Sequence, residues 1–599
     1  MTKSDIAPGR NKVKARVKSG CRTCKVRKVK CLSTGRVCDG YGVWGGGGNL
    51  YWHRQSSETP RDILYYPPVA CIPTLVASTD EMTSFDWFKG RTIIKLPGSY
   101  LSDFWTKNLL QASHSEQAVW HAVMALSFTH RLGFVQTSSD PATKLEQSTL
   151  RHLIKAVRHL NPHFSAKDKA SSRVVLIVCL VFVVLDLLRG HFPSAQVHLR
   201  NGLSILAETQ SIPHEGKCNP RNYLQRLREP IDDSIGEAFF RLHTQVQLLQ
   251  HLHRPRPCIL PSALQLPPTF EGPLSPQFPS YTAVWRSLDH LMNEVFRLSA
   301  LARENPTKSS TYRLTTLKEH IKKGLDTWQK TYTLSLPTLQ LSISSTVAEA
   351  KAKVHGLVYS YHTMLTIMTE TALHQETETI FDKNNSNFGQ ILKYLSRVWT
   401  PTSQDPDYPT DSPFRRVRPK RSGEGSKTRK PKTYWIGTCD MAHTIIDIGW
   451  MIPLFYTAIK CRHRRMRRAA VRLLESTNHR EGIWDAKVTA CVARRVMEFE
   501  EGDFYDSYIT TSSTTGSNLE GDDNGEESVV SMSSLDLDLD LEDAEAEEPM
   551  LPESNRIRDL EVQMEGDPLE KVLLFGGWEG MAAGRVCIGE YLVPEQRGL

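Results

Sequence analysis

The chain has 599 residues, enough for several domains or for one large core with inserts. Its formal net charge of +8 is a sum of opposites: residues 1–40 carry twelve Lys and Arg against two Asp, whereas residues 498–548 carry eighteen Asp and Glu and no Lys or Arg. This division favours nucleic acid and protein partners. The first residues, MTKSDIAPGRNKVK, contain no apolar run, so we expect no secretory leader and a reducing, intracellular compartment.

Residues 1–42 form a basic segment that contains four cysteines. Cys21, Cys24, Cys31 and Cys38 follow the spacing C-x2-C-x6-C-x6-C. Thiolates at short spacing can close a tetrahedral zinc site, which orders a segment too short to have its own core. The cations that lie before and between them include Lys18, Arg22, Lys25, Arg27, Lys28, Lys30 and Arg36. The segment therefore predicts a zinc site that presents basic side chains to DNA.

Residues 43–82 are rich in glycine and proline and are interpreted as a linker. The helical pattern that follows, over residues 83–400, predicts an all-α body. Ser113 and Glu116 predict a capping box ahead of the apolar run through Val119, Val123 and Leu126. One amphipathic face is predicted for Leu314, Leu317, Ile321, Leu325 and Trp328. The apolar stretch 174–185 is shorter than the ~20 residues of a membrane span, so it predicts a central buried helix and no membrane partner.

Two inserts interrupt this body. Residues 401–433 contain the basic run Arg415, Arg416, Arg418, Lys420 and Arg421, which indicates either a nuclear-import signal or a solvated, disordered loop. The body continues over 434–497. Residues 498–552 form an acidic insert that includes SLDLDLDLED at 534–543, a composition typical of disordered activation segments, although a solubilising insert fits it too. Residues 553–599 complete the body.

The sequence contains no constellation typical of an enzyme. His479, Glu481 and Asp485 lie close together in NHREGIWDA, but a helix cap with surface ion pairs explains them better than catalysis. No G-x-S-x-G, H-E-x-x-H or phosphate-loop motif occurs. The eight cysteines after Cys38 are scattered singly, which predicts reduced core residues. We therefore expect a protein that is not an enzyme.

The cysteine segment and the body together resemble the fungal binuclear zinc-cluster (Zn2Cys6) transcription factors. Cys21, Cys24 and Cys31, with KVRKVK between the second and third, match the first half of that family's motif. SDFW at 102–105 and RVVLIVCLVFVVLDLLRGHFPSAQVHLRNGLSIL at 173–206 resemble its helical regulatory region, which DPLEKVLLFGGWEG at 567–580 closes. The resemblance implies base contacts for Arg27 and Lys28 and phosphate contacts for Lys25 and Lys30, with Arg22 and Lys18 completing the basic set.

The second half of the motif departs from the family. LSTGRVCDGY follows Cys31 directly, so four cysteines stand where the family has six. Two tetrahedral zincs need eight metal–sulfur bonds, and four thiolates do not supply them without unreasonable bridging. Three interpretations remain open: a single zinc, a metal-free basic tail, or a sequence that lacks an exon, which the intact flanks favour.

The resemblance implies a nuclear, DNA-binding regulator of RNA polymerase II genes that reads CGG-type sites through a zinc-supported basic helix. Its implied partners are double-stranded DNA, a second copy or a related zinc-cluster protein, and a coactivator on the acidic insert. The alternative function is a helical interaction protein without competent sequence-specific DNA binding, because the zinc cluster is incomplete.

Overall fold

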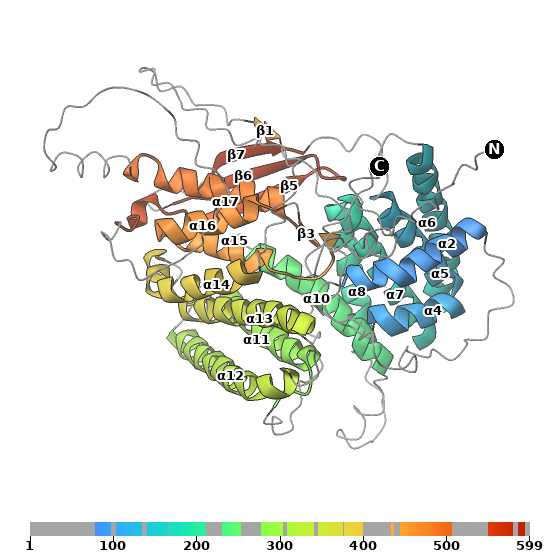
Figure 1. Cartoon of the computed structure of the whole chain (residues 1–599), viewed down its shortest axis with the longest axis horizontal. Coiled ribbons are helices and arrows are strands. Elements are labelled where there is room, and N and C mark those ends of the chain that lie inside the picture. The colour runs from blue at the N-terminus through green and yellow to red at the C-terminus, as the bar shows by residue number, and fades with distance from the viewer. Residues whose placement is uncertain are drawn as a thin grey trace, which may run out of the picture.

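Figure 1 shows the computed structural model of the chain. It describes residues 78–97, 104–133, 140–166, 168–210, 230–252, 277–303, 308–340, 345–374, 376–398, 433–435, 444–477, 479–505, 549–578 and 585–593. Most of these residues are helical, which confirms the predicted all-α class. A C-terminal sheet, which the sequence did not predict, packs against the helices.

The first helical bundle lies within residues 79–210. Its elements are α2 (Thr79–Trp87), η3 (Phe88–Thr92), α3 (Ile93–Lys95), η4 (Phe104–Asn108), α4 (Leu109–Ser115), α5 (Gln117–Leu132), α6 (Asp140–Ala166), α7 (Lys169–Arg189) and α8 (Phe192–Gln210). A capping box starts α2, because Ser78 Oγ accepts from the Glu81 amide while the Glu81 carboxylate accepts from the Ser78 amide. Helices α5, α6 and α8 all pack against α7, which is therefore the centre of this bundle.

Helix α7 contains the apolar stretch predicted to be a buried helix. Asp168 caps its start by accepting from the Ser171 amide at 2.8 Å, and Gly190 ends it with φ of +78°. In the part of the chain that the structure describes, α7 is the helix long and apolar enough to cross a membrane, by length and composition only. The length argument from the sequence was thus wrong, since the helix has 21 residues. However, 83% of its most apolar window is buried within the protein.

The capping box predicted for Ser113 and Glu116 is wrong. Ser113 lies inside α4, where its hydroxyl donates to the Leu110 carbonyl at 2.7 Å. Glu116 precedes α5 in an extended conformation and makes no side-chain cap hydrogen bond. The run that follows is helical and buried at Val119 and Val123, as predicted. The helix therefore forms because of its apolar face and not because of a cap.

A second bundle follows. Its elements are α10 (Pro230–Leu252), α11 (Tyr281–Arg303), α12 (Lys308–Gln340), α13 (Ser345–Thr371), η5 (Thr379–Asn384) and α14 (Asn385–Val398). The predicted amphipathic face of α12 is confirmed. Leu314, Ile321, Leu325 and Trp328 are buried, and Leu317 is half-buried. These side chains form the face of α12 that packs against α11 and α13.

A third group of elements lies on the side of the second bundle that faces away from α12 (Figure 1). It consists of α15 (Met451–Lys460), α16 (Arg464–Glu475), α17 (Ala486–Glu501) and the short strands β2 (Thr444–Ile445), β3 (Arg480–Glu481) and β4 (Trp484–Asp485). Strand β3 pairs in parallel with β2 and in antiparallel with β4. The last turn of α17 contains Glu498, Glu500 and Glu501, the first carboxylates of the acidic insert.

The C-terminal sheet has the strand order β1-β7-β6-β5. Its strands are β1 (Thr433–Trp435), β5 (Asp559–Glu565), β6 (Lys571–Gly577) and β7 (Val586–Leu592), with the 3₁₀ turn η8 (Glu553–Asn555) before β5. Strands β5, β6 and β7 are antiparallel neighbours, whereas β1 joins β7 in parallel. Tyr591 Oη donates to the Cys491 carbonyl at 3.2 Å, which fixes the sheet on α17. Segment 567–580, expected in the helical region, thus contains a strand.

The turn between β5 and β6 reaches back to the first bundle. Asp567 accepts from Ser194 Oγ at 2.6 Å, and its other carboxylate oxygen lies 2.8 Å from His191 Nδ1. The Leu569 amide donates to the Gly190 carbonyl at 3.0 Å. These contacts join positions more than 370 residues apart in the chain. The sheet therefore bridges the first bundle and the third group of elements.

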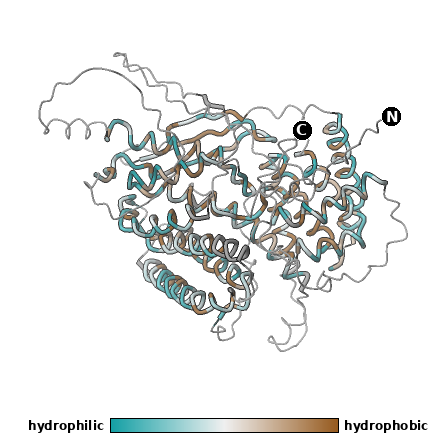
Figure 2. The backbone as a smooth tube through the Cα atoms, viewed as in Figure 1, coloured by the Kyte–Doolittle hydropathy of each residue, from teal (hydrophilic) through white to brown (hydrophobic). Residues whose placement is uncertain are grey.

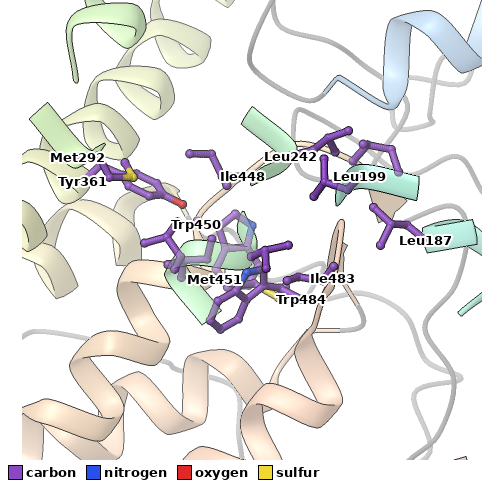
Figure 3. Close-up of a cluster of buried hydrophobic side chains, with 14 of the residues drawn as sticks. Leu187, Leu199, Leu242, Met292, Tyr361, Ile448, Trp450, Met451, Ile483 and Trp484 are labelled. Carbon is purple, nitrogen blue, oxygen red and sulfur yellow. The ribbon is translucent and has the colours of Figure 1, made fainter. Parts of the chain in front are cut away.

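One continuous hydrophobic core runs through all these parts. In Figure 2 the hydrophobic stretches lie mainly where elements face one another. Figure 3 shows side chains from both bundles converging on the third group. Leu187 and Leu199 come from the first bundle, Tyr361 from the second, and Trp450 and Trp484 from the third. The described body is thus held together by shared burial.

Candidate functional site

Every predicted metal-binding and DNA-binding residue lies outside the described residues. These are Cys21, Cys24, Cys31 and Cys38, together with Lys18, Arg22, Lys25, Arg27, Lys28 and Lys30. The basic run 415–421 and the acidic stretch 506–548 lie outside them as well. Within the described ranges, no group of three or more His, Cys, Asp or Glu is placed to hold a metal. The zinc prediction therefore stays a prediction.

Of the eight scattered cysteines, the described ones are free. Cys179, Cys461 and Cys491 are buried and Cys587 is half-buried. Burial raises the pKa of the Cys179 thiol to about 12, which suits an inert core residue. The prediction of reduced core cysteines is confirmed for the three buried positions.

The motif NHREGIWDA, the nearest thing to a catalytic constellation in the sequence, is a pair of helix caps. The carboxylate of Glu481 accepts from the amides of Gly449 and Trp450, at 2.9 and 2.8 Å, at the start of α15. Asp485 caps α17 by accepting from the Lys487 amide at 3.0 Å. The cap interpretation is confirmed. The expectation of surface ion pairs is wrong, because His479, Glu481 and Asp485 are buried.

The most unusual polar feature of the described body is a buried ionic junction, defined here as Arg241, Asp289 and Asp447. Arg241 Nε and one terminal nitrogen bind both oxygens of Asp447 at 2.8 and 2.9 Å. Its other terminal nitrogen donates to Asp289 at 2.6 Å. Arg241 lies on α10, Asp289 on α11 and Asp447 in the segment before α15. The junction thus ties the helical bundle to the third group at one point.

The charges of the junction do not balance, because one guanidinium faces two carboxylates. Burial alone would lower the pKa of Arg241, but Asp289 and Asp447 hold it above its usual value. Burial raises the pKa of Asp289 to about 6, with Asp447 adding to the rise and Arg241 opposing it. Burial also raises the pKa of Asp447. Asp289 is therefore a carboxyl group that titrates near pH 6 in the folded protein.

A small pocket opens beside the junction. It is lined by Pro97, Trp105, Ala238, Arg241, Leu242, Gln245, Ile446 and Asp447. Gln245 donates to the Ile446 carbonyl at 2.5 Å, so its amide is already engaged at the rim. The pocket has room for about one water molecule, which is too little for an organic ligand. The arrangement therefore suits a structural link and offers no substrate site.

A second set of buried charges, the C-terminal ionic network, lies between α15, α17 and η8. We define it as Glu378, Arg462, Arg467, Glu500 and Arg556. Glu500 binds Arg462 at 2.8 Å and Arg467 at 2.7 Å, with all three side chains almost fully buried. Arg462 also reaches Glu378 at 2.9 Å, and Arg556 donates to the Glu378 carbonyl. The network connects the two ends of the acidic insert to η5.

Sequence reasoning missed both ionic sets. A usable signal was present: Arg241 stands in the apolar run AFFRLH, and Asp447 stands in TIIDIGW. A lone charge within buried apolar neighbours requires a partner, because an unpaired buried charge is very costly. However, Arg241 and Asp447 are 206 residues apart, and no local sequence pattern identifies them as partners.

Comparison with known proteins indicates which class of protein this chain is similar to. Residues 91–386 match the family model described as the fungal specific transcription factor domain. This region covers most of both helical bundles, from η3 to the start of α14, and so includes Arg241 and Asp289. The match supports a fungal transcription regulator.

Two curated regulators are similar to this chain. The aspercryptin biosynthesis cluster-specific transcription regulator atnN of Emericella nidulans is 29% identical over 227 residues, which are 33% of this chain and 36% of that protein. The transcription regulator lscL of Purpureocillium lilacinum is 24% identical over 229 residues, which are 35% of this chain and 52% of that protein. The similarity thus spans about half or less of either relative. No solved structure matches the chain significantly.

Proposed function

We propose that the chain is a nuclear regulator of RNA polymerase II transcription that binds double-stranded DNA. The observation that carries this proposal is the fungal specific transcription factor domain at residues 91–386 in one chain with a basic cysteine segment. The names of the two relatives support the regulatory class. Since the match covers the helical body, DNA contact is inferred from the N-terminal sequence.

We assign the DNA contact to the segment between Cys21 and Cys38. Arg27 and Lys28 would hydrogen-bond guanine O6 and N7 in the major groove of a CGG-type site. Lys25 and Lys30, with Arg22 and Lys18, would lie along phosphates, where they supply affinity without sequence information. Lysine and arginine in one compact segment supply both kinds of contact.

Zinc would support that segment. Structural zinc takes four ligands, so the four thiolates of Cys21, Cys24, Cys31 and Cys38 fit one tetrahedral ion. They do not fit the two ions of a binuclear cluster, which needs eight metal–sulfur bonds. When bound, one zinc would fix the shape of a segment too short to fold alone. We therefore propose one zinc for each chain of the printed sequence.

The remaining segments suit the same role. The basic run Arg415–Arg421 would serve nuclear import, and the acidic insert would recruit a coactivator through its Leu/Asp alternation. A second copy or a related zinc-cluster protein would supply the second half-site contact.

The four-cysteine spacing also favours a second candidate function. With an incomplete cluster, the chain would be a regulatory interaction protein that binds partners through its helical body and has no site-specific contact with DNA. Non-specific attraction to phosphate would remain, because the segment keeps its positive charge.

Metal content and DNA binding separate the two functions. We expect one zinc per purified chain by metal analysis, and none in a Cys24→Ser variant. In fluorescence anisotropy, a duplex with a CGG triplet should bind more tightly than a scrambled duplex. Arg27→Ala should reduce that preference by about 1–3 kcal/mol. Lys25→Ala should weaken both duplexes equally and reduce the slope of affinity against salt by about one.

Lys144→Ala, on the exposed face of α6, is the control and should change neither duplex. Equal affinity for both duplexes with a steep salt slope and no zinc would support the interaction protein instead. Sequencing the transcript across codons 28–40 tests separately whether a C-x2-C pair is missing from the printed chain.

A further inference from the structure

Helix α16 presents a row of arginines on its exposed side. Arg465, Arg468 and Arg472 are three and four residues apart, so their side chains share one face of the helix. Arg465 and Arg472 are exposed, and neither forms an ion pair with another residue in the described ranges. Arg468 pairs with Glu501 at 3.0 Å and is still partly exposed. We call these three side chains the arginine face.

The opposite side of α16 is fully used by the fold. Met466, Ala470 and Leu474 are buried there, where α16 packs on α14, α15 and α17. Buried Arg467 is neutralised by Glu500. The arginine face is therefore an excess of positive charge that packing does not explain.

Both ends of the acidic insert are linked to residues at the start of α16. At the start of the insert, the Tyr505 ring lies 4.3 Å from the guanidinium of Arg464, the first residue of α16. At its end, the Leu551 carbonyl accepts from Arg556, whose guanidinium also donates to the Glu378 carbonyl. Glu378 in turn binds Arg462, three residues before Arg465. A chain segment between 505 and 551 therefore begins at the first residue of α16 and ends in the buried network that contains Arg462, two residues before that helix.

The charge of the insert complements the arginine face. Residues 506–548 contain fourteen Asp and Glu and no Lys or Arg. Eight of these acids lie in residues 536–548, directly before Pro549, where the described chain resumes. Thirteen extended residues span about 45 Å, far more than the length of α16, so the acids reach the arginine face without strain.

We propose that the acidic segment 534–548 of the same chain docks on the arginine face of α16. The contact consists of Asp and Glu carboxylates on Arg465, Arg468 and Arg472. Each exposed pair is weak, but the short tether gives an effective concentration in the millimolar range, which populates a contact too weak to form between separate molecules. The docking depends on salt, because exposed pairs are screened at high ionic strength.

This docking prevents the acidic segment from binding the proposed coactivator, because the same carboxylates cannot contact both surfaces. The docking itself needs neither zinc nor DNA, so it stands or falls separately from the proposed DNA contact. A phosphate backbone on the arginine face is the rival occupant, and the experiment below distinguishes it.

Limited thermolysin digestion of the full-length protein tests the docking. The enzyme cleaves before Leu535, Leu537, Leu539 and Leu541, which all variants retain. Cleavage before Phe414, which lies in the other insert, provides an internal reference for protease activity. At low salt, the Arg465→Glu/Arg472→Glu variant should be cleaved at the leucines at least about twofold faster than the wild type, relative to Phe414. At about 1 M salt the two proteins should be cleaved alike.

Arg151→Glu/Arg158→Glu on α6 is the matched control, with the same seven-residue spacing on an exposed helix face. It should behave as the wild type. Replacing Asp536, Asp538 and Asp540 by Lys changes the residue before three of the cleaved bonds, so this change is compared in two backgrounds. With Arg465→Glu/Arg472→Glu it should be cleaved more slowly than with the wild-type arginine face, because both charges are then reversed.

Equal low-salt cleavage of wild type and Arg465→Glu/Arg472→Glu overturns the docking. If that variant instead loses affinity for a scrambled DNA duplex without any change in cleavage, the arginine face binds phosphate and the docking is again overturned.

Discussion

At the scale of single residues, buried Arg241 lies between two carboxylates. Asp447 is buried and Asp289 is half-buried, with 13% of its side chain exposed, and the sum of the three charges is −1. Coulomb attraction to one guanidinium offsets only part of the cost of desolvating two anions. The remaining cost of desolvation is seen at Asp289, because burial raises the pKa of its carboxyl to about 6. Asp289 is thus mostly ionised at pH 7 and gains a proton as the pH falls through about 6.

Replacing Asp289 by Asn should change how stability depends on pH. Because the pKa of Asp289 is raised in the folded protein, its stabilising contribution is present below about pH 4 and is lost as the pH rises through about 6. Asn keeps an acceptor for Arg241 and carries no charge. We expect Asp289→Asn to gain on the order of 2 kcal/mol relative to the wild type between pH 4 and 7.5.

Urea denaturation at a series of pH values measures this difference. Asp326→Asn, at an exposed position of α12, should follow the wild-type curve. A difference between Asp289→Asn and wild type that does not vary with pH would contradict the assignment.

At the scale of elements, close helix packing depends on one glycine of α8. A methyl group at Gly202 would overlap the Phe239 ring of α10 and approach the Cys179 sulfur of α7 to 3.1 Å. Three helices therefore meet where that side chain is missing. Helix propensity alone would favour alanine by about 1 kcal/mol. Overpacking, at about 1–3 kcal/mol, outweighs that gain.

Gly202→Ala should therefore destabilise the protein, by about 1–2 kcal/mol net. Gly236→Ala on α10 is the matched control, because its methyl would meet Leu206 at 3.9 Å, an ordinary contact. We expect that control to be neutral or stabilising by up to about 1 kcal/mol. Thermal unfolding of both variants tests the pair, and a stabilised Gly202→Ala would show that α8 and α10 are less tightly packed.

At the scale of the whole molecule, the C-terminal ionic network and the sheet connect parts of the chain that are distant in sequence. Glu500 on α17 binds Arg462 and Arg467 and also accepts from the Ile557 amide at 2.8 Å. The turn at Asp567 is held by α8 and the residue before it. The C-terminal segment therefore spans the molecule from the third group to the first bundle.

Replacing Glu500 by Gln should destabilise the whole molecule. The isosteric change removes the carboxylate that pairs with buried Arg467 and one of the two carboxylates that pair with Arg462. Loss of one partner from a buried pair costs about 3–5 kcal/mol. Burial opposes ionisation, but Arg462 and Arg467 hold the pKa of Glu500 at about 2. Its contribution is therefore present above about pH 4.5 and is lost as the pH falls toward 2.

Denaturation at neutral pH compares this variant with Glu498→Gln, a more exposed position on the same helix. We expect a large loss for Glu500→Gln and a change within about 0.5 kcal/mol for Glu498→Gln. A Glu500→Gln variant as stable as the wild type at neutral pH would contradict the role assigned to the network.

The sequence predicted the helical class and several individual helices correctly. The spacing of Leu314, Ile321 and Leu325 predicts the buried face of α12, because residues three and four apart lie on the same face of a helix. The apolar stretch in α7 names a buried helix for the same reason. The zinc and DNA contacts also come from local spacing, between Cys21 and Cys38, and stay predictions.

Tertiary structure decided what depends on distant partners. Strand β1 pairs with β7 across more than 150 residues, so no local pattern could predict the sheet. Arg241 and Asp447 find one another only when two elements pack, and the capping box at Ser113 failed because the chain places that residue inside α4. Helix hydrogen bonding and the spacing of apolar residues depend on residues that are close in the sequence. Strand partners, ion-pair partners and the burial of each side chain depend on how the elements pack in the folded protein.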